Sequence, residues 1–283
     1  MLTKSQLKEV FVKYGFTPLK RFGENYLIDG NIKNKIIGEV RAVKGDIVLE
    51  IGPGLGALTI DLAESGAKVF AVEKDRKAFA ILEGLAGRDF PNLVLLNDDI
   101  FGFDLGKIAA AKKIKVVGNL PYYITTPIIE YLIRNRNLIR SALIMVQREV
   151  ANRLLAASGT KDYSSVSCFV QYYTKPAYIH TVKRTSFYPA PDVDSSLIRL
   201  DMLDEPSVKV RDEELFFKTV RGAFNQRRKS ILNSLSRKEA LNLPKEKLLG
   251  ILKGAGIAPS VRPESLSLSD FAAIANAVVA SKN

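Results

Sequence analysis

The sequence has one cysteine, Cys168, and one histidine, His180, among its 283 residues. A lone cysteine excludes an internal disulfide, and with a single histidine beside it a Cys/His metal site is not expected. No apolar run approaches the roughly 20 residues that cross a bilayer, and residues 1–20 lack the apolar core and cleavage site of a secretory signal. These absences predict a protein of the reducing cytoplasm, with no metal and no membrane partner.

The charge is strongly unbalanced. Lys and Arg number 42 against 30 Asp and Glu, which gives a net charge of +12. A basic excess favours a polyanionic partner such as nucleic acid, because Lys and Arg that neutralise phosphates release counterions; the alternative is a cytosolic protein that is merely basic. The length, with 47% hydrophobic and 25% charged residues, suits a globular chain with one ordinary domain and a smaller companion.

The apolar run 47–51 is followed by three glycines at alternate positions: Gly52, Gly54 and Gly56. A helical pattern comes next, so the stretch predicts a buried strand, a tight turn and a helix, as at the start of a nucleotide-binding sheet. Glycines let the backbone approach a ligand closely, and a helix start presents unpaired N–H groups. With Ala57, the turn also satisfies the G-x-G-x-x-G/A pattern of dinucleotide enzymes, and similar turns occur where nothing binds.

The rest of the chain predicts an α/β fold. Strands are predicted at 47–51, 68–73, 93–97, 114–118 and 141–146, and helices at 57–65, 75–85, 126–134 and 147–156. This alternation indicates a parallel sheet, and β-rich runs at 166–173, 177–183 and 196–201 indicate an antiparallel edge. A helix with Ile32, Ile36 and Val40 on one face, capped by Asp29 or Asn31, precedes the first strand.

A linker at 203–207 then divides the chain. After it the pattern becomes purely helical, with helices predicted at 211–223, 227–236, 244–254 and 267–279. We therefore expect a Rossmann-like domain over 1–203, to whose site residues 1–30 contribute, and a smaller all-helical C-terminal domain over 204–283.

Four candidate binding residues fall at the carboxyl ends of predicted strands, where open α/β sheets bind ligands: Gly52, Glu73, Asp98 and Asn119. Glu73 can accept both ribose hydroxyls of an adenosine moiety, or it can cap the next helix, a role that Asp75 already fills. Asp98 can accept from the adenine amino group. Asp99 competes with it, because adjacent side chains point to opposite sides and only one can face the ligand; a turn or cap role remains open for both.

The segment Asn119-Leu120-Pro121-Tyr122 has the form of the (Asn/Asp/Ser)-Pro-Pro-(Tyr/Phe) motif of amino-methyltransferases, which favours S-adenosylmethionine as the cofactor. Adenine's exocyclic amine is a poor nucleophile because its lone pair is delocalised into the ring. The Asn119 side-chain oxygen and the Leu120 carbonyl could accept its two N–H groups and turn the lone pair to the methyl group. Pro121 stiffens the turn, and Tyr122 offers a ring for the base to stack on. No general base is needed, and His180 is expected to be structural.

Two further regions complete the candidate site. Phe187, in a stiff proline-rich loop, could sandwich a flipped base against Tyr122 or could simply anchor the loop. A basic segment between the first two C-terminal helices suits phosphate binding, with a solvated basic face as the alternative. The predicted RNA-binding residues are Lys20, Arg21, Arg148, Arg221, Arg227, Arg228 and Lys229, and Arg153, Lys183 and Arg184 could extend that surface.

Six motifs in order resemble the ribosomal RNA adenine N6,N6-dimethyltransferases of the KsgA type (RsmA) over nearly the whole chain. They are Phe22-Gly23-Glu24-Asn25-Tyr26-Leu27, Glu50-Ile51-Gly52-Pro53-Gly54, Asn119-Leu120-Pro121-Tyr122, Val146-Gln147-Arg148-Glu149, Phe187-x-Pro189-x-Pro191-x-Val193-x-Ser195 and Phe224-x-Gln226-Arg227-Arg228-Lys229. Glu24 departs from the usual Gln and adds negative charge near the cofactor's sulfonium.

The resemblance implies that Asn25 and Leu27 contact the methionine end of S-adenosylmethionine, and it favours Asp98 over Asp99. It also implies dimethylation of two adjacent adenosines near the 3′ end of small-subunit rRNA in a late pre-30S particle, by an enzyme that we expect to be monomeric. Two alternatives stay open. One is a large-subunit rRNA adenine methyltransferase of the macrolide-resistance type, and the other is a ribosome-assembly factor in which methylation is secondary.

Overall fold

The computed structural model describes residues 2–18, 25–86, 89–109, 112–226 and 228–281. Six residues named above lie outside these ranges: Lys20, Arg21, Phe22, Gly23, Glu24 and Arg227. Within them, no helix is both long and apolar enough to span a membrane.

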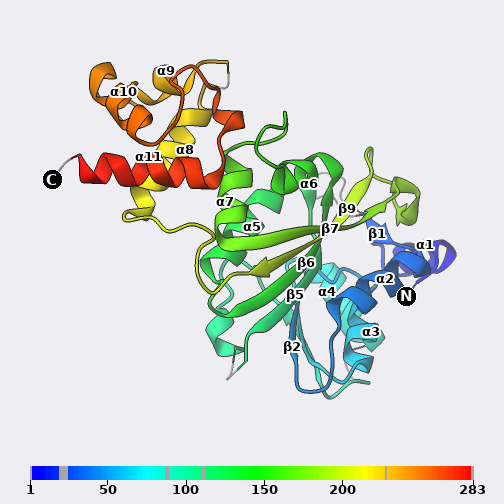
Figure 1. The fold of residues 1–283 in the computed structure, drawn as a ribbon. Helices are drawn as coiled ribbons and strands as arrows, with labels where there is room; N and C mark the ends of the chain where they lie inside the picture. The colour runs from blue at the N-terminus through cyan, green and yellow to red at the C-terminus, as the bar shows by residue number, and fades with distance from the viewer. Residues whose placement is uncertain (1, 19–24, 87–88, 110–111, 227, 282–283) are drawn as a thin grey trace. The chain divides into compact units, whose positions relative to one another are not determined.

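By internal contacts the chain divides into two compact units, which are described separately (Figure 1). The first unit comprises residues 1–151 and 176–202, and the second comprises 152–175 and 203–283. The contacts therefore group 152–175 with the C-terminal helices. A domain boundary between 203 and 204 stays a prediction.

A seven-stranded sheet in the order β4-β3-β2-β5-β6-β9-β7 forms the centre of the first unit. Its strands are β2 (Ile47–Ile51), β3 (Lys68–Glu73), β4 (Leu93–Asn97), β5 (Ile114–Asn119), β6 (Ile139–Gln147), β7 (Thr174–Val182) and β9 (Ser195–Met202). The pairs from β4 to β6 are parallel, and β9 runs antiparallel to β6. This arrangement confirms the predicted Rossmann-like α/β class and the antiparallel strand late in the chain.

Helices cover the sheet because each buries one apolar face. They are α2 (Gly30–Val40), α3 (Thr59–Glu64), α4 (Arg76–Ala86) and α5 (Thr125–Arg134). Helix α1 (Lys4–Lys13) instead buries Leu7 and Val10 against α4, and α6 (Arg148–Leu155) follows β6. The predicted apolar face of α2 packs with α3 against the sheet. Of the two predicted candidates, Asp29 is the N-cap of α2, because its carboxylate accepts the N–H groups of Asn31 and Ile32 at 3.0 and 3.3 Å.

The strand order reverses between β2 and β5. From β2 the chain adds β3 and β4 on one side, and then returns to add β5 and β6 on the other (Figure 1). Loops leaving β2 and β5 therefore diverge and leave a crevice at the carboxyl ends of these strands. Gly52 follows β2 and Asn119 ends β5, so the two predicted motifs flank this crevice.

A short antiparallel ribbon joins the start of the chain to the proline-rich loop. β1 (Tyr26–Leu27) pairs with β8 (Phe187–Tyr188), with Leu27 opposite Phe187. Two further hydrogen bonds extend the ribbon: Ile28 N–H donates to the Ser186 carbonyl at 2.9 Å, and the Ser186 hydroxyl donates to Asp29, also at 2.9 Å.

The second unit is helical. It contains α7 (Ser165–Tyr173), α8 (Glu213–Phe224), α9 (Ile231–Leu235), α10 (Lys245–Gly254) and α11 (Leu268–Ala280). The predicted C-terminal helices are confirmed, although α9 is shorter than expected, so that Arg228 and Lys229 lie in the turn before it.

The prediction of a β-rich run at 166–173 was wrong, because this segment is helix α7. Its alternating β-branched and aromatic residues favour a strand locally. Tertiary packing overrides that preference: the Tyr172 ring stacks on Phe216 at 4.9 Å, and the Tyr173 hydroxyl donates to Glu213 at 2.6 Å. At the helix start, Ser164 N–H donates to the Ser167 hydroxyl at 3.0 Å.

We predict that Gly222→Ala destabilises the second unit by about 1–3 kcal/mol, because overpacking forces neighbours apart. A Cβ at Gly222, in α8, would lie 2.5 Å from the Ala240 Cβ. Gly250→Ala, in α10, is the control. No atom lies within 4 Å of its Cβ position, so better helix propensity should stabilise by about 0.5–1 kcal/mol. Thermal unfolding measures both, and equal shifts in Tm would contradict the expectation.

Candidate functional site

A cavity of about 480 Å³ lies at the carboxyl ends of β2, β3, β4 and β5, within the range of small-molecule sites. Of the predicted cofactor residues, the cavity is lined by Asn25, Leu27, Gly52, Gly54, Glu73, Asp98 and Asn119. The structure therefore brings all seven together, although sequence positions 25 and 119 are far apart. His180, on β7, is not among the lining residues.

The glycine turn needs glycine on conformational grounds. Gly52, Gly54 and Gly56 have φ values of 67°, 57° and 84°, a region that side-chain-bearing residues rarely adopt. No protein atom lies within 4 Å of a Cβ built on Gly52, so this part of the turn faces open space. A Cβ on Gly54 would approach the Tyr26 ring at 3.0 Å, so the turn and the N-terminal segment lie close together.

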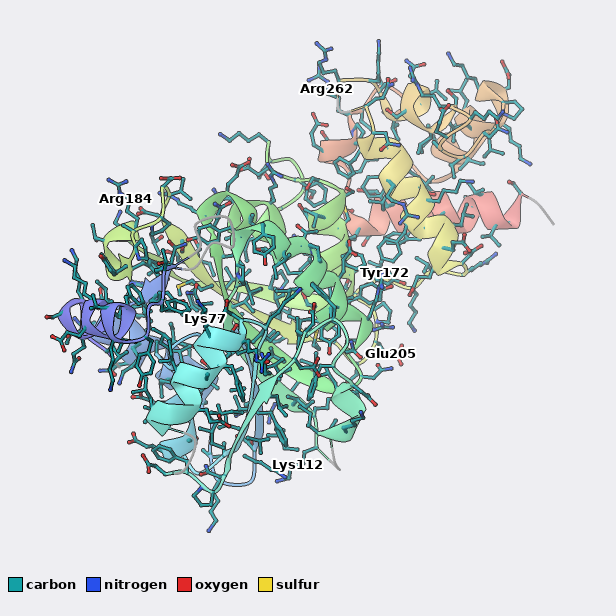
Figure 2. The ribbon with its side chains drawn as sticks, turned by 180° about the vertical axis from the view of Figure 1, so that it is seen from behind. Lys77, Lys112, Tyr172, Arg184, Glu205 and Arg262 are labelled. Carbon is teal, nitrogen blue, oxygen red and sulfur yellow. The ribbon has the colours of Figure 1, made fainter. Side chains whose placement is uncertain are left out.

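Glu73 ends β3 with its carboxylate turned towards the glycine turn. Gly54 N–H donates to its Oε2 at 2.9 Å, and Asp75 N–H donates to its Oε1 at 2.8 Å. The predicted capping role falls to Asp75, whose Oδ1 accepts the N–H groups of Lys77 and Ala78, both at 2.8 Å. Glu73 also lines the cavity. Figure 2 labels Lys77 on α4.

Asp98 and Asp99 both line the cavity, and which of the two side chains faces a ligand stays a prediction. Their partners differ. Asp99 accepts from Lys74 Nζ at 2.7 Å and from Phe101 N–H at 3.1 Å, and the Lys74 hydrogen bond lowers the pKa of Asp99. Asp98 is exposed, and in the described part of the chain it accepts only Asp99 N–H, at 2.7 Å. Asp98 therefore has more capacity to accept a ligand's amino group.

Asn119 is oriented by the N-terminal segment. Its side-chain N–H donates to the Asn25 carbonyl at 2.9 Å. With the amide nitrogen engaged there, the side-chain oxygen accepts no hydrogen bond from the described residues. The backbone of Leu120 is fixed as well, because its N–H donates to the Met145 carbonyl at 3.1 Å.

Tyr122 and Tyr123 diverge after Pro121. Tyr122 is partly buried, and its hydroxyl shares a 2.8 Å hydrogen bond with the buried Ser195 on β9. Burial raises the pKa of Tyr122, so the hydroxyl stays protonated. Tyr123, by contrast, is exposed and lines the cavity, whereas Tyr122 is not among the lining residues. Sequence reasoning chose Tyr122 and missed Tyr123.

Phe187 is 2% exposed and packs in the core with Leu27 and Val182. It does not line the cavity. In this structure it therefore anchors the β1–β8 ribbon, the second of the two roles considered for it. Stacking of Phe187 on a flipped base stays a prediction that this conformation does not display.

Glu50 was not predicted as a site residue, although a carboxyl within the apolar run 47–51 is a visible signal. It is 2% exposed and lines the cavity, and its Oε2 has no hydrogen-bond partner. Burial raises the pKa of Glu50 to about 8, opposed by the Thr59 hydroxyl and reinforced by the charge of Glu73. An unsatisfied, buried acid facing a cavity marks a ligand contact.

The predicted RNA-binding residues within the described ranges are at the surface. Arg148 is exposed in the first unit, and Arg221, Arg228 and Lys229 are exposed in the second. In the first unit Lys183 pairs with Asp194 at 3.2 Å, and the exposed Arg184 follows it between β7 and β8, where Figure 2 labels it.

We predict that Glu50→Gln raises Tm by several degrees at pH 9 but has little effect at pH 4. The Glu50 pKa is about 8 in the folded protein against 4.5 for an ordinary glutamate. The stability contributed by the protonated carboxyl is therefore complete below pH 4.5 and is lost as the pH rises through 8. Thermal unfolding between pH 4 and 9 measures it, with exposed Glu64→Gln as control. A Tm difference that does not grow with pH would contradict the assignment.

The Tyr122–Ser195 hydrogen bond should couple these residues energetically. Tyr122→Phe and Ser195→Ala are each expected to cost about 1–2 kcal/mol, because each leaves a buried partner unsatisfied. The double variant should lose little more than either alone. The loss of stability caused by Ser196→Ala, at the adjacent buried serine, should instead add independently to the loss caused by Tyr122→Phe. Urea unfolding of the three single variants and of the two double variants that contain Tyr122→Phe tests this, and additivity at Ser195 would refute the coupling.

Comparison with known proteins identifies a family. The family described as ribosomal RNA adenine dimethylase matches residues 15–279. A ribosomal RNA small subunit methyltransferase A from Moorella thermoacetica is 47% identical over 270 residues, 92% of each chain.

Two solved structures share the fold. A dimethyladenosine transferase from Plasmodium falciparum superposes with a TM-score of 0.76 at 27% identity, covering 88% of this chain and 95% of that one. The 23S rRNA methyltransferase ErmE gives a TM-score of 0.70 at 24% identity, covering 90% and 100%, a likeness of fold alone. Because the family match spans nearly all of the sequence and the Moorella relative is so similar throughout, this chain belongs to the ribosomal RNA adenine dimethylase family.

Proposed function

We propose that this chain is an S-adenosylmethionine-dependent enzyme that dimethylates the N6 amines of two adjacent adenosines near the 3′ end of small-subunit rRNA. The observation that carries the proposal is the placement of Asn119 at the cavity, with its amide nitrogen engaged by Asn25 and its oxygen available. Family membership and relatives named as small-subunit methyltransferases, 41–47% identical over nearly the whole chain, favour this substrate.

The residues around the cavity fit S-adenosylmethionine. The open space over Gly52 leaves room for a ligand against the turn, and the unpartnered Glu50 Oε2 suits a cationic ligand group. We assign Glu73 to the ribose hydroxyls, Asp98 to the adenine amine, and Asn25 and Leu27 to the methionine end. When bound, this cofactor supplies an electrophilic methyl group.

Asn119 and Leu120 act on the target amine. The Asn119 side-chain oxygen and the Leu120 carbonyl each accept one N–H of the adenine amine, which frees its lone pair from the ring and aims it at the methyl group. Because the Asn25 carbonyl already holds the Asn119 amide nitrogen, the acceptor is oriented before the base arrives, and this positioning lowers the barrier. Pro121 keeps the turn rigid, since its φ is fixed.

The RNA contacts are assigned to the exposed basic residues. Arg148, Arg221, Arg228 and Lys229 would neutralise backbone phosphates, as would Lys20, Arg21 and Arg227, which lie outside the described residues. We further propose that the enzyme acts as a monomer in the cytoplasm on a late pre-30S particle.

The two alternatives lead to different products. A large-subunit enzyme of the resistance type would leave its label in large-subunit rRNA, and the identities of the small-subunit relatives do not favour it. An assembly factor would bind subunits whether or not it methylates them. Mapping the methylated nucleotides in each rRNA distinguishes both alternatives from the proposal.

The experiment supplies isotopically labelled S-adenosylmethionine with undermethylated small subunits, large subunits and naked rRNA in parallel. Dimethyladenosine is then mapped after nuclease digestion. Label at two neighbouring adenosines of small-subunit rRNA supports the proposal, and label only in large-subunit rRNA supports the resistance type. Tight subunit binding without label supports an assembly factor.

Asn119→Ala should lower kcat on small subunits by at least about 100-fold, the usual loss for one preorganised transition-state contact. Its affinity for small subunits should not change, because phosphate contacts lie elsewhere. Asn31→Ala, an exposed residue in the first turn of α2, is the matched control and should retain full activity. Retention of kcat by Asn119→Ala would overturn the assigned role.

A further inference from the structure

Two exposed aromatic side chains line the cavity without a role in the proposed function. Phe101 is 43% exposed and Tyr123 is 53% exposed. Among the described residues, the other aromatic side chains with comparable exposure are Tyr14 and Tyr178, and neither lines the cavity. Two of these four exposed rings therefore line the same cavity, and exposed apolar side chains that gather in one place are typical of a binding site. We call Phe101 and Tyr123 the cavity aromatics.

Phe101 is held in place by its surroundings. Its ring makes a T-shaped contact with Tyr131, with centroids 6.2 Å apart and planes at 87°. The Tyr131 hydroxyl donates to the Phe103 carbonyl at 2.7 Å. The Phe101 N–H donates to Asp99, which is paired with Lys74 at 2.7 Å. An exposed but fixed ring offers a stacking surface at little cost in conformational entropy.

Tyr123 is fixed by the turn that carries the catalytic motif. It lies four residues after Asn119 in the 3₁₀ turn Tyr122–Ile124, whose Ile124 N–H donates to the Pro121 carbonyl at 3.2 Å. Since the preceding Tyr122 is tied to Ser195, the turn exposes its second tyrosine at the cavity.

We propose that the cavity aromatics form a stacking subsite for an unpaired nucleobase of the RNA, the one adjacent to the adenine being methylated. The inference rests on the proposed function. Proteins that bind single-stranded RNA stack splayed bases on exposed aromatic rings, and the net charge of +12 favours a nucleic acid. An enzyme that modifies two neighbouring adenosines must hold one base while the other occupies the site.

The exposure of the cavity aromatics distinguishes a nucleobase of the RNA from the cofactor as the group that stacks on them. Glu73, assigned to the ribose, is 9% exposed and Glu50 is 2% exposed, whereas Asp98, assigned to the adenine amine, is exposed. The cavity aromatics are far more exposed than either glutamate, so they face the side from which a large substrate approaches. Stacking of the cofactor's own adenine on these rings is the competing outcome.

The test compares Phe101→Ala, Tyr123→Ala and Tyr123→Phe with the wild type. Tyr178→Ala is the matched control, because Tyr178 is 55% exposed and away from the cavity. Calorimetry gives the Kd for S-adenosylmethionine, and steady-state methylation of undermethylated small subunits gives KM and kcat.

We expect each alanine variant at the cavity to raise KM for subunits about 5- to 30-fold, the loss of one base–aromatic stack. The Kd for S-adenosylmethionine should stay within about twofold, and Tyr123→Phe, which keeps the ring, should behave as the wild type. Unchanged KM values, or a cofactor Kd that weakens as much as KM rises, would overturn the subsite.

Failure of the proposed function gives a different result. If wild-type protein methylates large-subunit rRNA instead, the function is wrong, and the same variants are compared by their KM for that RNA. If the wild type methylates no RNA, the variants are compared by their Kd for small subunits. Wild-type-like values would overturn the subsite in either case.

Discussion

The reversal of strand order between β2 and β5 is the constraint on which the rest of the site depends. Loops on either side of a reversal separate, and a ligand can enter only there. The chain places its glycine turn on one side, where positive φ values exclude most other residues, and Asn119 on the other. Neither motif would form a site at another strand end, since loops that run in the same direction close over each other.

A second layer of contacts fixes the groups that face the cavity. Asn25 orients Asn119, and Ser195 restrains Tyr122, so two parts of the chain remote in sequence act on one turn. The β1–β8 ribbon holds the N-terminal segment near this turn, and buried Phe187 anchors the ribbon. Residues of the proline-rich loop thus hold the N-terminal segment in place beside the cavity.

The elements that alternate along the chain could be predicted from the sequence because their signals are local. Strand ends, the glycine turn and the Asp29 cap follow from periodicity and capping chemistry. Helix α7 could not be predicted from the sequence, because its residues favour a strand locally. The contacts of Tyr172 and Tyr173 with α8 stabilise the helix instead. Which of Tyr122 and Tyr123 lines the cavity, and whether Phe187 is buried, also depend on contacts with residues far away in the sequence.

Glu50 occupies a position that suits the cavity but lowers the stability of the fold. A carboxyl buried among β-strand residues without a partner for Oε2 destabilises the ligand-free protein once it ionises. Replacing it with an apolar residue would improve the core, yet would remove a buried acid that faces the cavity beside the glycine turn. Local choices that act against stability concentrate at functional sites. The position of this acid at the centre of the sheet therefore supports the cofactor site independently of the motif that contains it.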